Sequence, residues 1–254
     1  MRTLAVIPAR LGATRLPRKP LRLLAGLPLV VRVWQRVQRL GVADHCVVAT
    51  ESDEVARAAR DAGAEVTLTD PGHPSGTDRV AEVAARPEFR HFDAILNVQG
   101  DEPFVSAAAL RGAAAMLRGE RFVLGTAATP APPDVLGVPH VVKVVADDDG
   151  RAMYFSRAPI PFLRDESERH LLHTRVWQHV GIYAYTRDAL ARWVALPPHP
   201  LERIERLEQL RPLAAGMAIG VAVVGERPHG GVDTEEDLAR ANAEWDRFAS
   251  ADQT

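Results

Sequence analysis

The sequence predicts an α/β protein in which a mainly parallel, mixed central sheet is flanked by helices. In the first half of the chain, short apolar runs of strand length alternate with amphipathic stretches of helix length. Residues 4–7 form one such strand-like run, and residues 28–40 repeat apolar side chains at helical spacing. Pro28 suits the first turn of that helix and Gly41 suits its end. Strands and helices that alternate in this way indicate parallel strands joined by helical crossovers.

The remaining elements of the first half follow from the same patterns. Further strands are expected at residues 46–49, 65–68, 94–98 and 122–127. Further helices are expected up to Gly63 with Ser52 or Asp53 as the cap, over residues 75–86, and from Ser106 to about Gly119.

The alternation of strands and helices stops after Thr129, where a Pro-rich segment interrupts regular structure. Two apolar runs, residues 141–145 and 152–155, flank Asp147-Asp-Asp-Gly150 and predict a hairpin. Three aspartates can also form a metal site, but their place in a turn that ends in glycine favours turn chemistry. The last expected elements are a strand at 176–185, a helix at 201–210, a strand at 217–224 and a final helix capped by Asp233 or Thr234. We expect a single domain over residues 1–254, in which residues 130–200 carry a second face.

Composition excludes several classes of protein. The formal net charge is −2, so there is no global basic field to hold a nucleic acid. Cys46 is the single cysteine and excludes a disulfide within the chain, which fits a reducing compartment. No signal peptide and no apolar run of membrane-spanning length is visible. We therefore expect a cytoplasmic protein with no membrane or nucleic-acid partner.

Four cations follow the first strand within ten residues: Arg10, Arg15, Arg18 and Lys19. In open α/β sheets, ligands bind beyond the carboxyl ends of the strands, where cations and loop amides can surround phosphate oxygens. The loop contains neither a Walker motif nor a dinucleotide-binding glycine pattern. A triphosphate site is the functional interpretation, and a solvated surface loop is the alternative.

Three other segments present polar groups where a strand or loop ends. In the first, Ser75 can cap a helix, Gly76 permits close approach of a ligand, and Arg79 adds a cation one turn later. In the other two, Asp101 and Asp233 each follow a glycine-containing turn. Mg²⁺ prefers one or two carboxylates together with phosphate oxygens, so these two aspartates are candidate metal ligands. A plain helix cap is the alternative for each segment.

Seven motifs occur in order along the chain: VIPAR…TRLPxKP, HxSGTDR, NVQGDEP, FSRAxIP, HVGIYAY, LExxExLEQLR and GVDTxEDL. Together they resemble the 3-deoxy-manno-octulosonate cytidylyltransferases, the CMP-Kdo synthetase family of Gram-negative bacteria. The resemblance implies the nucleotide-diphospho-sugar transferase type of fold and a Mg²⁺-dependent homodimer. It also implies transfer of CMP from CTP to 3-deoxy-D-manno-octulosonate (Kdo), with release of pyrophosphate, for lipopolysaccharide biosynthesis.

The resemblance also implies roles for individual residues. Arg10, Arg15 and Lys19 would hold the triphosphate, with Ser75, Gly76, Arg79 and Gln99 around the nucleotide. Asp101 and Asp233 would bind the metal. Arg10, Lys19, Asp101 and Asp233 would be the catalytic residues. Residues 130–200 would bind the sugar acid and form the dimer contact. The sugar acid would meet Arg157, His179, Tyr183, Glu208 and Gln209.

The chemistry of the sugar-acid residues agrees with such a role. A carboxylate needs a cation such as Arg157. His179 and Tyr183 are four apart on an expected strand and so share a face, although two core residues would do the same. Glu208 and Gln209 are adjacent on an expected helix, so their side chains diverge by about 100°. We therefore expect only one of them to point at the ligand and the other to support it.

One position departs from the family pattern. Arg18 stands where the family usually has glycine, and arginine tolerates fewer backbone angles. Three other functions stay open: a cytidylyltransferase for a related acid such as 8-amino-Kdo or a sialic-type acid, a non-catalytic nucleotide-binding protein, and, more weakly, a glycosyltransferase.

Overall fold

The computed structural model describes residues 1–12, 15–225 and 229–251. The chain folds into two compact units, Met1–Val105 with His229–Thr254, and Ser106–Pro228. Of the described helices, none combines the length and apolar character needed to cross a bilayer. The single domain that the sequence suggested stays a prediction, and its second face at 130–200 falls within the second unit.

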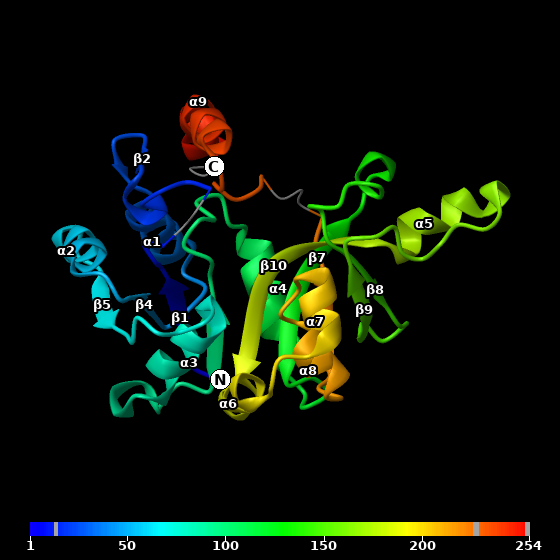
Figure 1. The fold of residues 1–254 in the computed structure, drawn as a ribbon, viewed down its shortest axis with the longest axis horizontal. Coiled ribbons are helices and arrows are strands. Elements are labelled where there is room, and N and C mark those ends of the chain that lie inside the picture. The colour runs from blue at the N-terminus through cyan, green and yellow to red at the C-terminus, as the bar shows by residue number, and fades with distance from the viewer. Residues whose placement is uncertain (13–14, 226–228, 252–254) are drawn as a thin grey trace. The chain divides into compact units, whose positions relative to one another are not determined.

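A parallel sheet organises the first unit, with strand order β6-β1-β4-β5. Figure 1 labels β1, β4 and β5 of this sheet. The strands are β1 (Thr3–Pro8), β4 (His45–Thr50), β5 (Glu65–Leu68) and β6 (Ala94–Asn97). Every residue of β1 and β6 is buried. This burial explains why their sequences are apolar on both faces rather than alternating.

Four helices belong to this unit: α1 (Leu29–Leu40), α2 (Asp53–Asp61), α3 (Gly76–Ala85) and α9 (Glu235–Ala251). The short elements are η1 (Lys19–Leu21), β2 (Leu23–Leu24), β3 (Leu27–Pro28) and η2 (Pro87–Phe89). The expected caps are present, because Ser52, Ser75 and Thr234 each accept a backbone N–H of the first helical turn. Gly41 ends α1 in the left-handed conformation.

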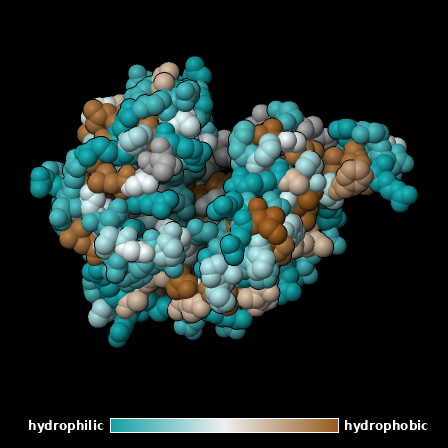
Figure 2. All heavy atoms as spheres, in the orientation of Figure 1, coloured by the Kyte–Doolittle hydropathy of each residue, from teal (hydrophilic) through white to brown (hydrophobic). Residues whose placement is uncertain are grey.

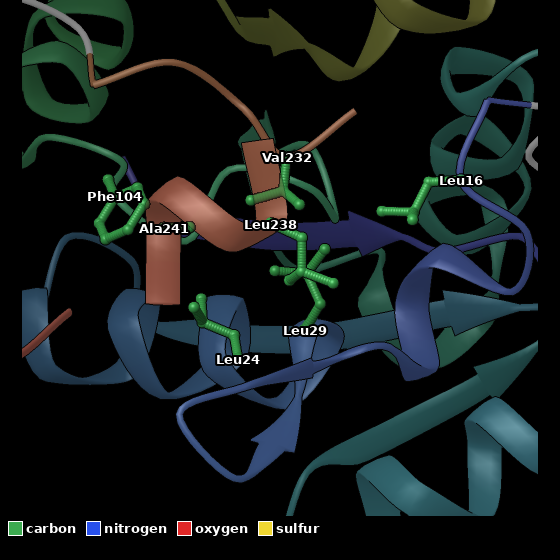
Figure 3. Packing of buried hydrophobic residues seen from close by; sticks show 7 residues of the cluster. All are labelled: Leu16, Leu24, Leu29, Phe104, Val232, Leu238 and Ala241. Carbon is green, nitrogen blue, oxygen red and sulfur yellow. The ribbon is translucent and has the colours of Figure 1, made fainter. Parts of the chain in front are cut away.

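An apolar cluster joins segments that lie far apart in the sequence (Figure 3). Leu16 comes from the loop after β1, Phe104 from the segment after β6, and Val232 from the segment before α9. All three are at most 8% exposed. Leu24, Leu29, Leu238 and Ala241 complete the cluster. The cluster therefore fixes the loop that follows β1 against the segments that carry Asp101 and Asp233.

The second unit contains a mixed sheet. The strands are β7 (Leu124–Pro130), β8 (Lys143–Ala146), β9 (Ala152–Ser156), β10 (Trp177–Thr186) and β11 (Ile219–Val223). β11 runs parallel to β7, whereas β7–β10, β10–β8 and β8–β9 are antiparallel. Its helices are α4 (Ala107–Ala115), η3 (Pro133–Val135), η4 (Glu166–Glu168), α5 (Arg169–Arg175), α6 (Arg187–Ala195), α7 (Pro200–Glu205) and α8 (Leu210–Ala214).

These elements confirm the predicted α/β class with a mainly parallel, mixed sheet flanked by helices. The β8–β9 hairpin is also as expected, and Asp147 Oδ1 accepts the backbone N–H groups of Asp149 and Arg151, as turn chemistry requires. The continuous helix expected at 201–210 is wrong. α7 ends at Glu205, and Arg206 has φ 55°, which breaks the helix before α8 begins.

Candidate active site

The centre of the candidate site is the Lys19 ammonium, which lies between two carboxylates. Lys19 Nζ donates to Asp101 Oδ2 at 2.6 Å and to Asp233 Oδ1 at 2.7 Å. Burial would lower the pKa of Lys19, but the two carboxylates outweigh it and raise the pKa above its ordinary value. The structure thus brings together one predicted triphosphate ligand and both predicted metal ligands, which are far apart in the sequence.

Backbone contacts and the apolar cluster hold these three residues in place. Val232 N–H donates to Asp101 O at 2.8 Å, which pairs the segment before α9 with the segment after β6. Gly100 sits so close to β1 that a Cβ there would lie 2.6 Å from Pro8 O. A side chain at position 100 would therefore displace the loop that carries Asp101.

The remaining cations of the opening loop lie at the surface. Arg15 donates to Asp233 Oδ2 at 2.8 Å, with its own side chain 68% exposed. Arg10 is exposed. Arg15 shares Asp233 with Lys19, and an exposed arginine in that position can reach the outer oxygens of a polyanion.

Arg18 is the residue that departs from the family pattern, and it adopts φ 57° and ψ 31°. This left-handed conformation is the one that glycine adopts most readily. The loop therefore keeps a glycine-like backbone with an arginine in place, and the Arg18 side chain pairs with Glu54 on α2.

The helix start at α3 lies beside β1. Ser75 Oγ accepts Asp78 N–H at 3.3 Å and donates to Asp78 Oδ2 at 2.6 Å. A Cβ on Gly76 would lie 3.4 Å from Pro8 Cγ. Gln99 is half-buried in the loop after β6. Gly76 thus lies against the end of β1. Contact of Ser75, Gly76 and Gln99 with a nucleotide stays a prediction.

Arg79 differs from the other predicted nucleotide residues, because its guanidinium is buried in an ion pair. The residue is 3% exposed, and its side chain pairs with Glu51 Oε2 at 2.8 Å and with the Thr69 hydroxyl. The other Glu51 oxygen accepts Leu11 N–H at 3.1 Å. The sequence interpretation missed Glu51, although a carboxylate directly after β4 lies at the same sheet edge as the opening loop.

Glu102 adds a third carboxyl group, and the negative charges of both aspartates affect its pKa. Burial raises its pKa to about 8, with further contributions from the negative charges of Asp101 and Asp233. The Lys19 ammonium opposes this rise in pKa. The local charge therefore depends on how many of these acids are ionised.

The two aspartates suit a magnesium ion. One oxygen of each is already directed at a single positive group, the Lys19 ammonium. Over the described part of the chain, no three His, Cys, Asp or Glu side chains form a group that could hold a metal. Two carboxylates, with the other positions filled by phosphate oxygens and water, match the usual Mg²⁺ ligand set.

In the second unit, His179 and Tyr183 lie on the same side of β10, with ring centroids 5.4 Å apart. The strand is irregular between them: His179 pairs with Ala128 and Tyr183 with Thr126, so four steps on β10 match two on β7. Gly181, at φ 76°, absorbs the irregularity. β10 therefore has two more residues than β7 over this stretch. Because successive strand residues alternate between faces, an even number of extra residues leaves His179 and Tyr183 on the same face, as predicted.

Hydrogen bonds define the state of the His179 ring. Thr126 Oγ1 donates its proton to Ile182 O at 2.6 Å and lies 2.9 Å from His179 Nε2. Since a hydroxyl has one proton, His179 Nε2 must carry hydrogen and donate, which leaves Nδ1 as an acceptor. Burial lowers the pKa of His179 to about 3, so the ring is neutral near pH 7.

Tyr183 is similarly enclosed. Its hydroxyl is buried and has no protein hydrogen-bond partner among the described residues. Burial, and then the nearby Tyr185 and Glu208, raise its pKa well above the ordinary value. A neutral hydroxyl and the His179 Nδ1 acceptor suit hydroxyl groups of a sugar rather than a charged group.

Arg157 makes three side-chain hydrogen bonds to backbone carbonyls. Nε donates to Glu205 O at 2.8 Å, and the two terminal nitrogens donate to Pro139 O at 3.1 Å and Arg206 O at 3.4 Å. A guanidinium has five N–H donors, so two remain for a carboxylate. Glu208 and Gln209 lie in the turn before α8, with Gln209 only 5% exposed. The expected divergence along a helix therefore does not apply to them.

Comparisons with known proteins agree with these motifs and this fold. A family model described as cytidylyltransferase matches residues 4–219. The chain is 63% identical, over 254 residues, to a 3-deoxy-manno-octulosonate cytidylyltransferase of Gemmatimonas aurantiaca, with 100% of this chain and 98% of the relative covered. The same enzyme of Polynucleobacter necessarius is 46% identical over 240 residues, 93% of each chain.

A solved structure gives the same result. It is a CMP:2-keto-3-deoxy-manno-octonic acid synthetase complexed with CTP, with a TM-score of 0.89 and 34% identity over 97% of this chain and 99% of that one. The resemblance inferred from the seven motifs is confirmed. The chain belongs to the 3-deoxy-manno-octulosonate cytidylyltransferase family, within the cytidylyltransferases.

Proposed function

We propose that this chain transfers CMP from CTP to Kdo and releases pyrophosphate, the reaction implied by the names of its relatives. The observation that carries the proposal is the Lys19 ammonium held between Asp101 and Asp233. A cation beside two converging carboxylates suits a metal-bound triphosphate and would have little use in a site for a neutral ligand.

The reaction is a single displacement at phosphorus. The anomeric hydroxyl oxygen of Kdo forms a bond to the α-phosphorus of CTP, while the bond from that phosphorus to the β-bridging oxygen breaks. Pyrophosphate leaves with the bonding electrons, and the hydroxyl proton passes to solvent. Positioning and charge stabilisation supply most of the catalysis in such transfers.

Residues of the first unit would hold the nucleotide. Arg10, Arg15 and Lys19 would stabilise the negative charge that develops on the leaving pyrophosphate. Ser75, Gly76 and Gln99 would lie around the nucleoside. Arg79 would support the nucleotide site without touching the nucleotide, because its buried guanidinium is already paired with Glu51.

Asp101 and Asp233 would hold Mg²⁺. When bound, the ion would neutralise charge on the phosphate oxygens and lower the pKa of the attacking hydroxyl. Lys19 would then contribute its charge to the triphosphate instead of to the two aspartates.

Residues of the second unit would bind the sugar acid. The remaining donors of Arg157 would take the carboxylate. His179 Nδ1 and the Tyr183 hydroxyl would take sugar hydroxyls, with Glu208 and Gln209 as further partners. His179 would bind as a neutral ring and would not serve as a general base, because its pKa is far below 7.

We also propose a homodimer formed through the second unit. Several large apolar side chains in the described part of this unit are exposed, among them Met153 at 64%, Phe162 at 84%, Leu171 at 47% and Ile204 at 77%. Figure 2 shows hydrophobic side chains among hydrophilic ones at the α5 end of this unit. Contiguous exposed apolar surface is typical of protein contacts. Light scattering would report a dimer, and Phe162→Asp would shift it toward monomer.

The cellular setting follows from the chemistry. A buried free thiol at Cys46 and a CTP substrate suit the cytoplasm. The product, an activated sugar acid, would serve lipopolysaccharide biosynthesis. Cell fractionation and the loss of Kdo-containing lipid on depletion of the chain would test these two points.

The proposed reaction is tested by pyrophosphate release with purified chain and Mg²⁺. CTP and UTP would each be offered with Kdo, 8-amino-Kdo and a sialic-type acid. We expect the highest kcat/KM with CTP and Kdo. A higher value with another acid would reassign the acceptor, and no turnover with any pair would leave a non-catalytic nucleotide-binding protein.

A further inference from the structure

Lys143, in β8, is a charged residue buried completely inside the second unit. Its exposed fraction is 0%. The Nζ atom donates to Val138 O at 3.1 Å, Val141 O at 2.7 Å and Arg157 O at 2.5 Å. Three carbonyl partners require three N–H donors, and an ammonium group has three where a neutral amine has two. A charge is tolerated at this depth because hydrogen bonds replace its water.

The composition of the chain indicates that lysine itself is needed here. The chain has 31 lysines and arginines, and only Lys19 and Lys143 are lysines. A planar guanidinium places its donors in a fixed fork, whereas an ammonium directs three donors tetrahedrally. The carbonyls of Val138, Val141 and Arg157 converge on one atom, an arrangement that a fork cannot satisfy.

Through its contact with Arg157 O, Lys143 is connected to the predicted sugar-acid residues. Arg157 N–H donates to Glu205 Oε2 at 2.9 Å, and the Arg157 side chain donates to the carbonyls of Glu205 and Arg206. Glu205 ends α7, and Arg206 begins the turn that carries Glu208 and Gln209. Lys143 therefore fixes the backbone of Arg157, and Arg157 in turn fixes the entry to this turn.

We propose that Lys143 is a positioning residue for sugar-acid binding, which sets the backbone of Arg157 without touching the substrate. The inference rests on the proposed function, because it assumes that Arg157 and the turn after α7 bind Kdo. Preorganised binding groups avoid the ordering cost that flexible groups incur when a ligand binds. Loss of the Lys143 contacts would therefore weaken Kdo binding and leave CTP binding in the first unit unchanged.

The test compares Lys143→Met and Lys143→Arg with the native chain. Arg151→Met, which removes an exposed cation from the same hairpin, is the matched control. All proteins are assayed with CTP and Mg²⁺ at least 10 °C below their unfolding midpoints. For both Lys143 variants we expect the KM for Kdo to rise about tenfold or more, with the KM for CTP within about twofold of native. The kcat at saturating Kdo should fall much less than kcat/KM.

The Arg variant retains the charge, so the test does not depend on whether the Met variant folds. Full restoration by arginine would show that charge alone is needed and would overturn the positioning role. A native KM for Kdo in a folded Lys143 variant, or equal rises in both KM values, would also overturn it. Absence of turnover in the native chain and in Arg151→Met would instead contradict the proposed function.

Discussion

Lys19 Nζ lies 2.6 Å from Asp101 Oδ2, although 82 residues separate the two in the sequence. The same ammonium lies 2.7 Å from Asp233 Oδ1. The distances follow from the backbone pairing of Val232 with Asp101 and from the apolar cluster that contains Leu16 and Val232. The charge arrangement of the candidate site is thus built by hydrophobic packing beneath it.

Asp101→Asn should abolish most turnover while the chain stays folded. The change keeps size but removes a charge from the proposed metal site, and such losses cost about 100-fold or more in kcat. Pyrophosphate release and the thermal unfolding midpoint would measure both effects. Asp148→Asn, at an aspartate whose side chain is 87% exposed, is the control and should keep native activity. A near-native rate for Asp101→Asn would contradict the metal assignment.

Glu51→Asp should weaken CTP binding more than it weakens the fold. Aspartate keeps a charge for Arg79 but is one methylene too short to reach Leu11 N–H as well. We expect faster hydrogen exchange of the Leu11 amide and a KM for CTP about five- to tenfold higher, because the loop loses preorganisation. Glu65→Asp, at the opposite end of the sheet, should change neither quantity. An unchanged Leu11 exchange rate would refute the role of Glu51.

His179 should make stability depend on pH on the acid side. Its pKa is about 3 in the folded chain, because of burial, against an ordinary value of 6.5. Between these values the unfolded chain binds a proton that the folded chain excludes, so the free energy of unfolding falls as the pH falls below 6.5. His179→Gln should flatten this dependence between pH 6.5 and 5, as measured by denaturant unfolding. The exposed His140→Gln should leave it unchanged, and identical slopes for the native chain and His179→Gln would contradict the burial of a neutral ring.

Arg18→Gly and Arg18→Val should separate backbone strain from charge. Glycine relieves a left-handed conformation that costs other residues about 1–2 kcal/mol, but it also increases the entropy of the unfolded chain. Loss of the exposed pair with Glu54 changes little. We expect Arg18→Gly to lie within about 1 kcal/mol of native and Arg18→Val to be less stable than Arg18→Gly by about 1–2 kcal/mol. Equal free energies of unfolding for the two variants would argue against strain at this position.

Local sequence patterns predicted most of the fold. Capping residues such as Ser52 and Ser106, and buried runs such as β1, have physical signals within a few neighbouring residues. The helix at 201–210 was predicted without a break because Arg206 gives no local signal for φ 55°. That conformation accompanies the Arg157 contact to Arg206 O, which comes from 49 residues away in the sequence.

The candidate site was predictable where residues carry chemistry at a strand end and not where they act through buried contacts. Lys19, Asp101 and Asp233 follow strands or glycine turns. Glu51 and Lys143 act through backbone atoms that only the folded chain brings to them. The burial of Arg79 was equally invisible, because its partners come from the segments that follow β4 and β5.

The most direct measurement follows the phosphorus atoms of CTP. The purified chain would be incubated with Mg²⁺, Kdo and CTP labelled at either the α- or the γ-phosphate, and the products would be separated. Transfer of CMP predicts that the α-label appears on the sugar acid and the γ-label in pyrophosphate, in equal amounts. Retention of both labels in CTP, or an α-label found only in free CMP, would contradict the proposed reaction.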